Sequence, residues 1–232
     1  MFLTTFLCVA GTLLVYQCVL RLYLRYRHPL INVVGISAAV IIAVLLLCGL
    51  PYSTYEPAKK LMTSLIGAAT VSLALPLYRY RKLLWRNAPA ILVSVSAGAF
   101  AAMFSAGLMA QAGGLPRQVV MSILAKGVSI PFAVEIAAIY DGIPSLAAAF
   151  VVATGTLGSL LGAWALTLAR VASPFARGLT LGTISHAQGT AAALQENEEA
   201  GAMAGLAMIL AGLLTAAFAP PVVWLLGMVH GG

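Results

Sequence analysis

Long apolar stretches, separated by short polar segments, dominate the pattern along this chain. Five stretches carry no charged residue and are long enough, at 1.5 Å per helical residue, to cross a hydrocarbon core about 30 Å thick. They lie at 2–20, 30–50, 88–110, 144–168 and 201–229. The pattern predicts membrane-spanning α-helices.

Three further apolar stretches, 60–78, 118–139 and 178–195, are interrupted by residues that weaken helices. A break facing lipid would leave backbone polar groups unsatisfied, so such breaks survive only where protein or a watery cavity covers them. The half-helices also aim positive N-terminal dipoles at the membrane midplane. The expected break positions are Gly67, Pro76, Gly127, Pro131, Gly182 and Gly189.

Together these stretches predict an all-α integral membrane protein with seven to eight transmembrane segments, interrupted helices and a transporter-like inverted repeat. Residues 1–232 are expected to form one domain. Stretch 2–20 has no basic residues before it and Arg21, Arg25 and Arg27 after it. That is the reverse of a cleaved signal peptide, so we expect a retained span with its N-terminus outside.

The direction of 118–139 decides the rest of the topology. If this stretch crosses the membrane, the loop with Arg170 and Arg177 lies outside and the acidic run 196–199 lies inside. If it is re-entrant, the basic loop and the acidic run both obey the positive-inside tendency. The re-entrant version is favoured, with 178–195 crossing. Segments 30–110 and 144–229 then form antiparallel triplets of span, broken segment and span. A rival pairing aligns Val71-Ser72 with Val128-Ser129.

Composition agrees with this class. Hydrophobic residues make up 62% and charged residues 8% of the 232 positions, too few charges to cover a soluble surface. The 13 basic against 6 acidic residues give a net charge of +7. The cations flank apolar stretches, which is the orientation signal of membrane loops and not a nucleic-acid surface. The three cysteines show no metal-ligand spacing and no enzyme motif occurs, so we expect no metal, no cofactor and no catalysis.

Two ionisable residues lie within interrupted stretches. Lys126 precedes the Gly127 break; an ammonium at membrane depth is costly and points to function, although it could instead reach the interface. His186 lies among hydroxyl side chains and is either a substrate contact or a structural histidine. A cation beside half-helix N-termini suits a small carboxylate. The candidate substrate contacts are Lys126, Ser129, Thr183, Ser185, His186 and Thr190, with Thr70 and Ser72 in the first interrupted stretch.

The run from Ala176 to Ala191, ARGLTLGTISHAQGTA, resembles the signature of the LrgB/CidB family of antiholin-like membrane proteins. Residues 69–78 and 124–144 fit the same family in order and spacing. Its basic position is Lys126 and its Ser-His pair is Ser185-His186. The chain departs from the family pattern at Ala125, at Ser129-Ile130 and at Gln195-Glu196.

The resemblance implies a bacterial inner-membrane protein with a small LrgA/CidA-like membrane partner. Relatives are linked to murein hydrolase control and lysis, and to transport of glycolate, glycerate or pyruvate. We therefore expect a carrier or facilitator for small monocarboxylates. The rivals are a holin-like pore or lysis regulator and a structural subunit. Two GxxxG patterns, at 158–162 and 201–205, predict close helix packing within a protomer or in a homo-oligomer.

Overall fold

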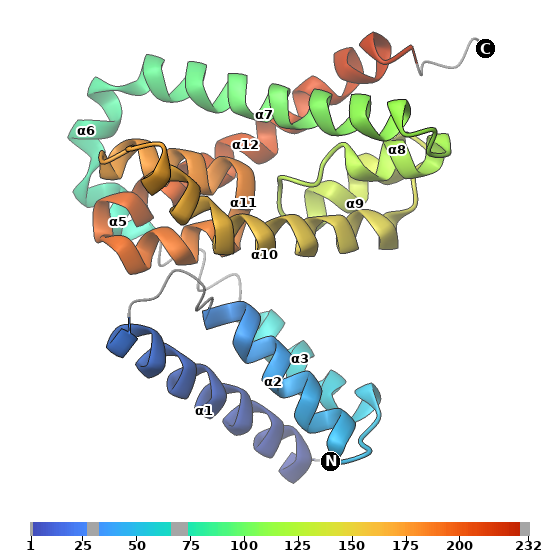
Figure 1. The fold of residues 1–232 in the computed structure, drawn as a ribbon, viewed down its shortest axis with the longest axis vertical. Helices are drawn as coiled ribbons and strands as arrows, with labels where there is room; N and C mark the ends of the chain where they lie inside the picture. The colour runs from blue at the N-terminus through green and yellow to red at the C-terminus, as the bar shows by residue number, and fades with distance from the viewer. Residues whose placement is uncertain (1, 27–32, 66–73, 228–232) are drawn as a thin grey trace. The chain divides into compact units, whose positions relative to one another are not determined.

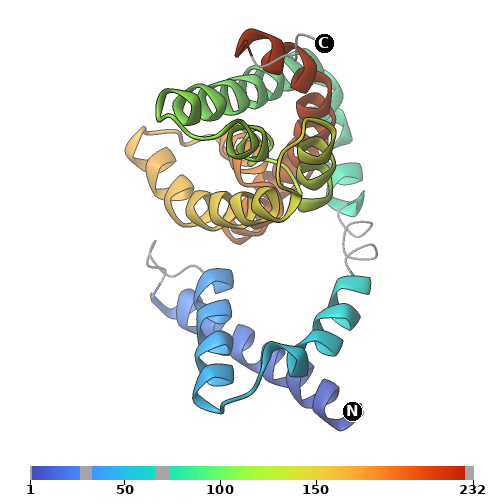
Figure 2. The same ribbon diagram turned by 90° about the vertical axis from the view of Figure 1, so that its right-hand side faces the viewer.

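The computed structural model describes residues 2–26, 33–65 and 74–227. Every regular element within these ranges is helical. The chain divides into two compact units, Met1–Ala74 and Leu75–Gly232. Helices of the first unit are blue to cyan in Figures 1 and 2, and those of the second run from cyan-green to red.

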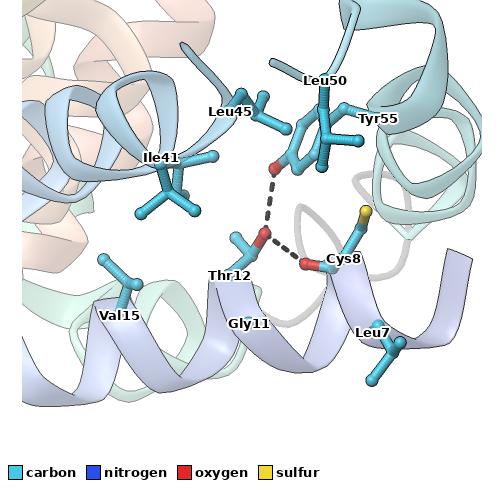
Figure 3. A pocket seen from close by; sticks show the side chains of 10 residues that line it. Leu7, Cys8, Gly11, Thr12, Val15, Ile41, Leu45, Leu50 and Tyr55 are labelled. Carbon is cyan, nitrogen blue, oxygen red and sulfur yellow. Dashed lines mark hydrogen bonds between the residues drawn. The ribbon is translucent and has the colours of Figure 1, made fainter. Parts of the chain in front are cut away.

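The first unit holds α1 (Phe2–Tyr26), α2 (Val33–Leu47) and α3 (Tyr52–Ser64), with α1 packed against both others. Thr12 of α1 and Tyr55 of α3 share a hydrogen bond of 3.0 Å beside an apolar cavity of about 200 Å³ (Figure 3). The predicted span 2–20 is confirmed as a long apolar helix. The predicted span 30–50 is described as a 15-residue helix, which at about 22 Å is shorter than the hydrocarbon core.

The second unit contains three long helices. These are α7 (Ala88–Ala112), α10 (Pro144–Leu168) and α12 (Glu198–Leu225). With α1 they are the helices of the described ranges long and apolar enough to cross a membrane, four in all. The spans expected at 88–110, 144–168 and 201–229 are confirmed as helices. The expected total of seven to eight transmembrane segments is not confirmed.

Shorter helices complete the second unit: α5 (Ala74–Arg79), α6 (Arg81–Arg86), α8 (Arg117–Ile123), α9 (Ile130–Ile139) and the bent α11 (Pro174–Glu196). Figure 1 shows α11 at the end of α7 that adjoins α6, and α8 and α9 at its opposite end. The basic segment 79–86 is mostly helical.

The core of the second unit is built on α12, which packs against α11, α7 and α9. Its buried face is rich in glycine and alanine, so the neighbouring backbones approach closely. An added Cβ at Gly178 or Gly182 of α11 would overlap the backbone oxygen of Ala200 or Ala204. Gly201 packs against Leu194 and Gly162 against Leu181. The two GxxxG patterns therefore pack helices within the protomer.

Candidate functional site

The segment 174–196 is a helical hairpin. His186 has φ 41° and ψ −127°, which ends one helical arm and begins the next. Arg177 Nε lies 2.6 Å from Glu196 Oε2, although the two residues are 19 positions apart. A straight helix would separate them by about 28 Å. The predicted crossing by 178–195 is therefore wrong: both ends of the segment lie together.

The base of this α11 hairpin is closed by Arg177. Its guanidinium donates to both carboxylate oxygens of Glu196, at 2.6 and 2.7 Å, and to the backbone oxygens of Val171 and Ala163, each at 3.0 Å. Such a two-point contact between guanidinium and carboxylate is among the stronger pairs in proteins. Arg177 thus joins the two arms to each other and to the C-terminal end of α10.

The segment 117–139 also folds back, as the favoured version predicts. Helices α8 and α9 are separated by the non-helical residues 124–129. Ser122, near the end of α8, accepts a 2.7 Å hydrogen bond from the N–H of Ile143, which follows α9. Pro131 is the second residue of α9 and Ser129 is its N-cap, which matches the break expected there. We call this segment the α8–α9 hairpin.

The tips of the two hairpins meet. A Cβ built on Gly127, at the α8–α9 tip, would lie 3.6 Å from the carbonyl oxygen of Ile184 and 3.7 Å from that of Thr183, both at the α11 tip. Lys126, the residue before Gly127, is half-buried. Within the described ranges, its ammonium has no carboxylate in an ion pair. The residue that carries this ammonium therefore precedes the point where the second and third interrupted stretches meet.

Four predicted contacts, Thr183, Ser185, His186 and Thr190, are buried in or near the α11 tip. His186 Nε2 is 3.1 Å from the backbone oxygen of Val151 in α10. Gly155 provides room for this ring, because an added Cβ there would come within 2.6 Å of Nε2. One ring nitrogen of His186 is therefore engaged by the protein itself. The positive φ of a buried histidine is strained, a feature that gathers at functional sites.

The hydroxyl groups around the tip are held by their own helices. Thr183 Oγ1 donates to the oxygen of Leu179 at 2.7 Å, and Thr190 Oγ1 to that of His186 at 2.9 Å. Ser185 packs against Gly158, where any Cβ would overlap its Oγ. Each of the two threonine oxygens keeps lone pairs that can accept a further hydrogen bond.

Two expected helix breaks have another role. Neither Gly182 nor Gly189 ends a helix; the reversal is at His186. Gly182 allows contact with Ala204 of α12, and Gly189 allows the second arm to contact the oxygen of Leu181 on the first. Glycine is needed at these positions because the backbones approach too closely for a side chain.

The first interrupted stretch contributes little to this description. Gly67, Thr70 and Ser72 lie outside the described residues, and Pro76 belongs to α5. Sequence reasoning missed the pairing of Arg177 with Glu196. The signal was available, because an opposite charge flanks each end of the third interrupted stretch.

These features define an α-helical membrane protein in which two helical hairpins meet at their tips. The sequence profile of the LrgB-like family matches residues 12–225, and the chain belongs to this family. It is 35% identical to the uncharacterized protein YxaC of Bacillus subtilis, over 92% of this chain and 93% of the relative. It is 31% identical to the holin-like protein CidB of Staphylococcus aureus, over 94% and 96% of the two chains. No solved structure matches it.

Proposed function

We propose that this protein carries small monocarboxylates, such as pyruvate, glycolate or glycerate, across the bacterial inner membrane. The observation that supports this is the meeting of two hairpin tips next to Lys126, whose ammonium has no ion-pair partner in the part of the chain that the structure describes. A carboxylate bound there would neutralise the ammonium at a depth where an isolated charge is costly. Ser129 and Thr183 supply hydroxyl groups next to the same junction.

One helix N-terminus from each hairpin lies near the junction. Helix α9 begins at Ile130, three residues after Gly127, and the second arm of α11 begins just after His186. Free N–H groups and the helix dipole favour an anion at such ends. Since Ser129 makes no side-chain cap to α9 and Pro131 has no N–H, the N–H groups of Ile130 and Phe132 are available to a ligand.

The second unit also supports a transporter-like arrangement. It contains two successive pairs of a long helix and a hairpin. The first pair is α7 with the α8–α9 hairpin, and the second is α10 with the α11 hairpin. We propose that these two halves have opposite orientations and that substrate binds between their hairpins, as in transporters with inverted repeats. The expected pairing of 30–110 with 144–229 assumed that 178–195 crosses, and the α11 hairpin contradicts that assumption.

The remaining expectations accompany this proposal: an external N-terminus, a small LrgA/CidA-like membrane partner and a homo-oligomer. The alternative is a holin-like pore or a regulator of lysis, which the name of the holin-like CidB relatives supports equally. A pore predicts release of dyes and ions without saturation. A carrier predicts saturable, competitive uptake.

Uptake of labelled pyruvate and glycolate into proteoliposomes tests the proposal. Replacing Lys126 with Ala removes one charge-assisted contact, so we expect KM to rise about tenfold or more, with Lys126→Arg keeping part of the affinity. The matched control is Lys82→Ala, an exposed cation of α6. Equal KM values for wild type and Lys126→Ala would remove Lys126 from the site. Dye release by all variants alike would favour the pore.

A further inference from the structure

A dense group of cations lies on α6 and at the end of α5. It consists of Arg79, Arg81, Lys82 and Arg86, with no acidic residue between them. Arg79 is paired with Glu198 of α12, whose Oε1 is 2.6 Å from its Nη1. The other three cations have no carboxylate in an ion pair within the part of the chain that the structure describes. Three exposed positive charges thus remain on α6.

The opposite face of the same segment is fixed to the core of the second unit. Tyr80, Leu83 and Leu84 pack against an apolar cluster that includes Val95 of α7 and Met203 of α12. Because these side chains hold α6 in place, the cations on its other face keep defined positions. The positive patch therefore belongs to the folded structure.

Two of the cations are neighbours on the helix. Lys82 and Arg86 are four residues apart, a spacing at which side chains share a helix face and like charges repel. Arg81 is held differently: its Cζ lies 4.1 Å from the ring centroid of Tyr78, and its Nη1 donates to the oxygen of that residue at 2.9 Å. An anion beside Lys82 and Arg86 would relieve their repulsion. A phosphate group suits this place, since it accepts charge-assisted hydrogen bonds from both side chains.

The patch also lies where a membrane helix begins. Helix α6 ends at Arg86, and α7, which is long and apolar enough to cross a membrane, begins at Ala88 (Figure 1). Between the two cations in sequence is Trp85, whose side chain is 81% exposed. Tryptophan is favoured at the headgroup level of a bilayer, where its ring is partly desolvated and its N–H stays wet. Lys82 and Arg86 are thereby placed at the level of the lipid phosphates.

We propose that Lys82, Arg86 and Trp85 form a binding site for the headgroup of an anionic phospholipid. The lipid phosphate lies between the two cations, and the indole ring of Trp85 lies beside the glycerol region. A zwitterionic lipid brings its own cation to the patch, so an anionic lipid is preferred. Each lysine or arginine near an anionic membrane surface strengthens the attraction about fivefold. The inference does not depend on the proposed function.

Tryptophan fluorescence in bilayers tests this preference at the site itself. The chain has three tryptophans, and Trp164→Phe with Trp224→Phe, both at exposed positions, leaves Trp85 as the reporter. The bilayers mix phosphatidylglycerol with phosphatidylcholine, and one lipid or the other carries bromine on its acyl chains near the glycerol. We expect phosphatidylglycerol to quench Trp85 with a relative binding constant about five- to twentyfold higher. At about 1 M salt, where the Debye length is about 3 Å, this preference should fall toward one.

The same measurement on charge variants separates a local site from a general effect of net charge. Lys82→Gln with Arg86→Gln should bring the preference close to one, whereas the exchange Lys82→Arg with Arg86→Lys should keep it. The matched control is Lys59→Gln with Lys60→Gln, which removes two exposed cations from α3 and should change nothing. Circular dichroism checks that all variants keep their helices.

Equal quenching by the two lipids in the reporter protein overturns the inference. So does a preference that survives loss of both cations of α6, or one that the α3 variant abolishes as well. Absence of quenching by either lipid would place α6 away from the bilayer. Loss of the preference on adding inorganic phosphate at constant ionic strength would assign the patch to a free anion, and this too would overturn the lipid site.

Discussion

Replacing Arg177 should open the base of the α11 hairpin, and its cost can be worked out from the contacts of the guanidinium. Arg177→Gln removes the two bonds to Glu196 and the bonds to Ala163 and Val171. It also leaves the Glu196 carboxylate without its cation, at only 20% side-chain exposure.

Breaking a fully buried ion pair costs about 3–5 kcal/mol. Because Arg177 and Glu196 retain 14% and 20% exposure, water screens them partly, and we expect a loss of about 2–4 kcal/mol in the free energy of unfolding. A second ion pair provides the comparison. Arg79 and Glu198 are also 2.6 Å apart, but their side chains are 59% and 47% exposed, so Arg79→Gln should cost at most about 1 kcal/mol.

The assay is unfolding of the purified protein in mixed micelles by increasing SDS, followed by tryptophan fluorescence. The exchanged pair, Arg177→Glu with Glu196→Arg, should recover part of the loss, since the ion pair returns but the contacts with α10 do not. Similar losses for Arg177→Gln and Arg79→Gln would refute the reasoning. So would an exchanged pair no more stable than the single variant, because hairpin closure would then not depend on this pairing.

Two further predictions concern the packing and the direction of the second unit. Gly182→Ala should reduce the yield of folded protein and destabilise it by about 1–3 kcal/mol, because its Cβ would overlap the backbone of Ala204. The control Gly11→Ala should be neutral, since the space around its Cβ is open. Equal losses of stability in the two variants would contradict the close packing at Gly182. In a cysteine-free background, Asp141→Cys and Val171→Cys should react with a membrane-impermeant maleimide from opposite sides, because α10 between them is about 37 Å long. Labelling from one side would show that α10 does not span.

Much of the fold could be predicted from local sequence alone. The boundaries of α7 and α10 follow from uninterrupted apolar stretches, since in lipid the only cheap conformation of such a segment is a helix. The break around Gly127 and Pro131 was likewise local, because glycine and proline weaken a helix wherever it packs. Lys126 could be singled out because an ammonium within an apolar stretch is costly in any fold.

Tertiary structure alone decided the course of 174–196. Its hydropathy is the same whether it crosses or turns back, and the contact that distinguishes the two joins Arg177 to Glu196, 19 residues away. The reversal falls on His186, whose positive φ no local rule predicts, and is held by the oxygen of Val151. Gly182 was expected to break a helix but instead packs against the backbone of Ala204 in α12. Only the tertiary structure could show this, because the role of the glycine depends on which segment lies opposite it.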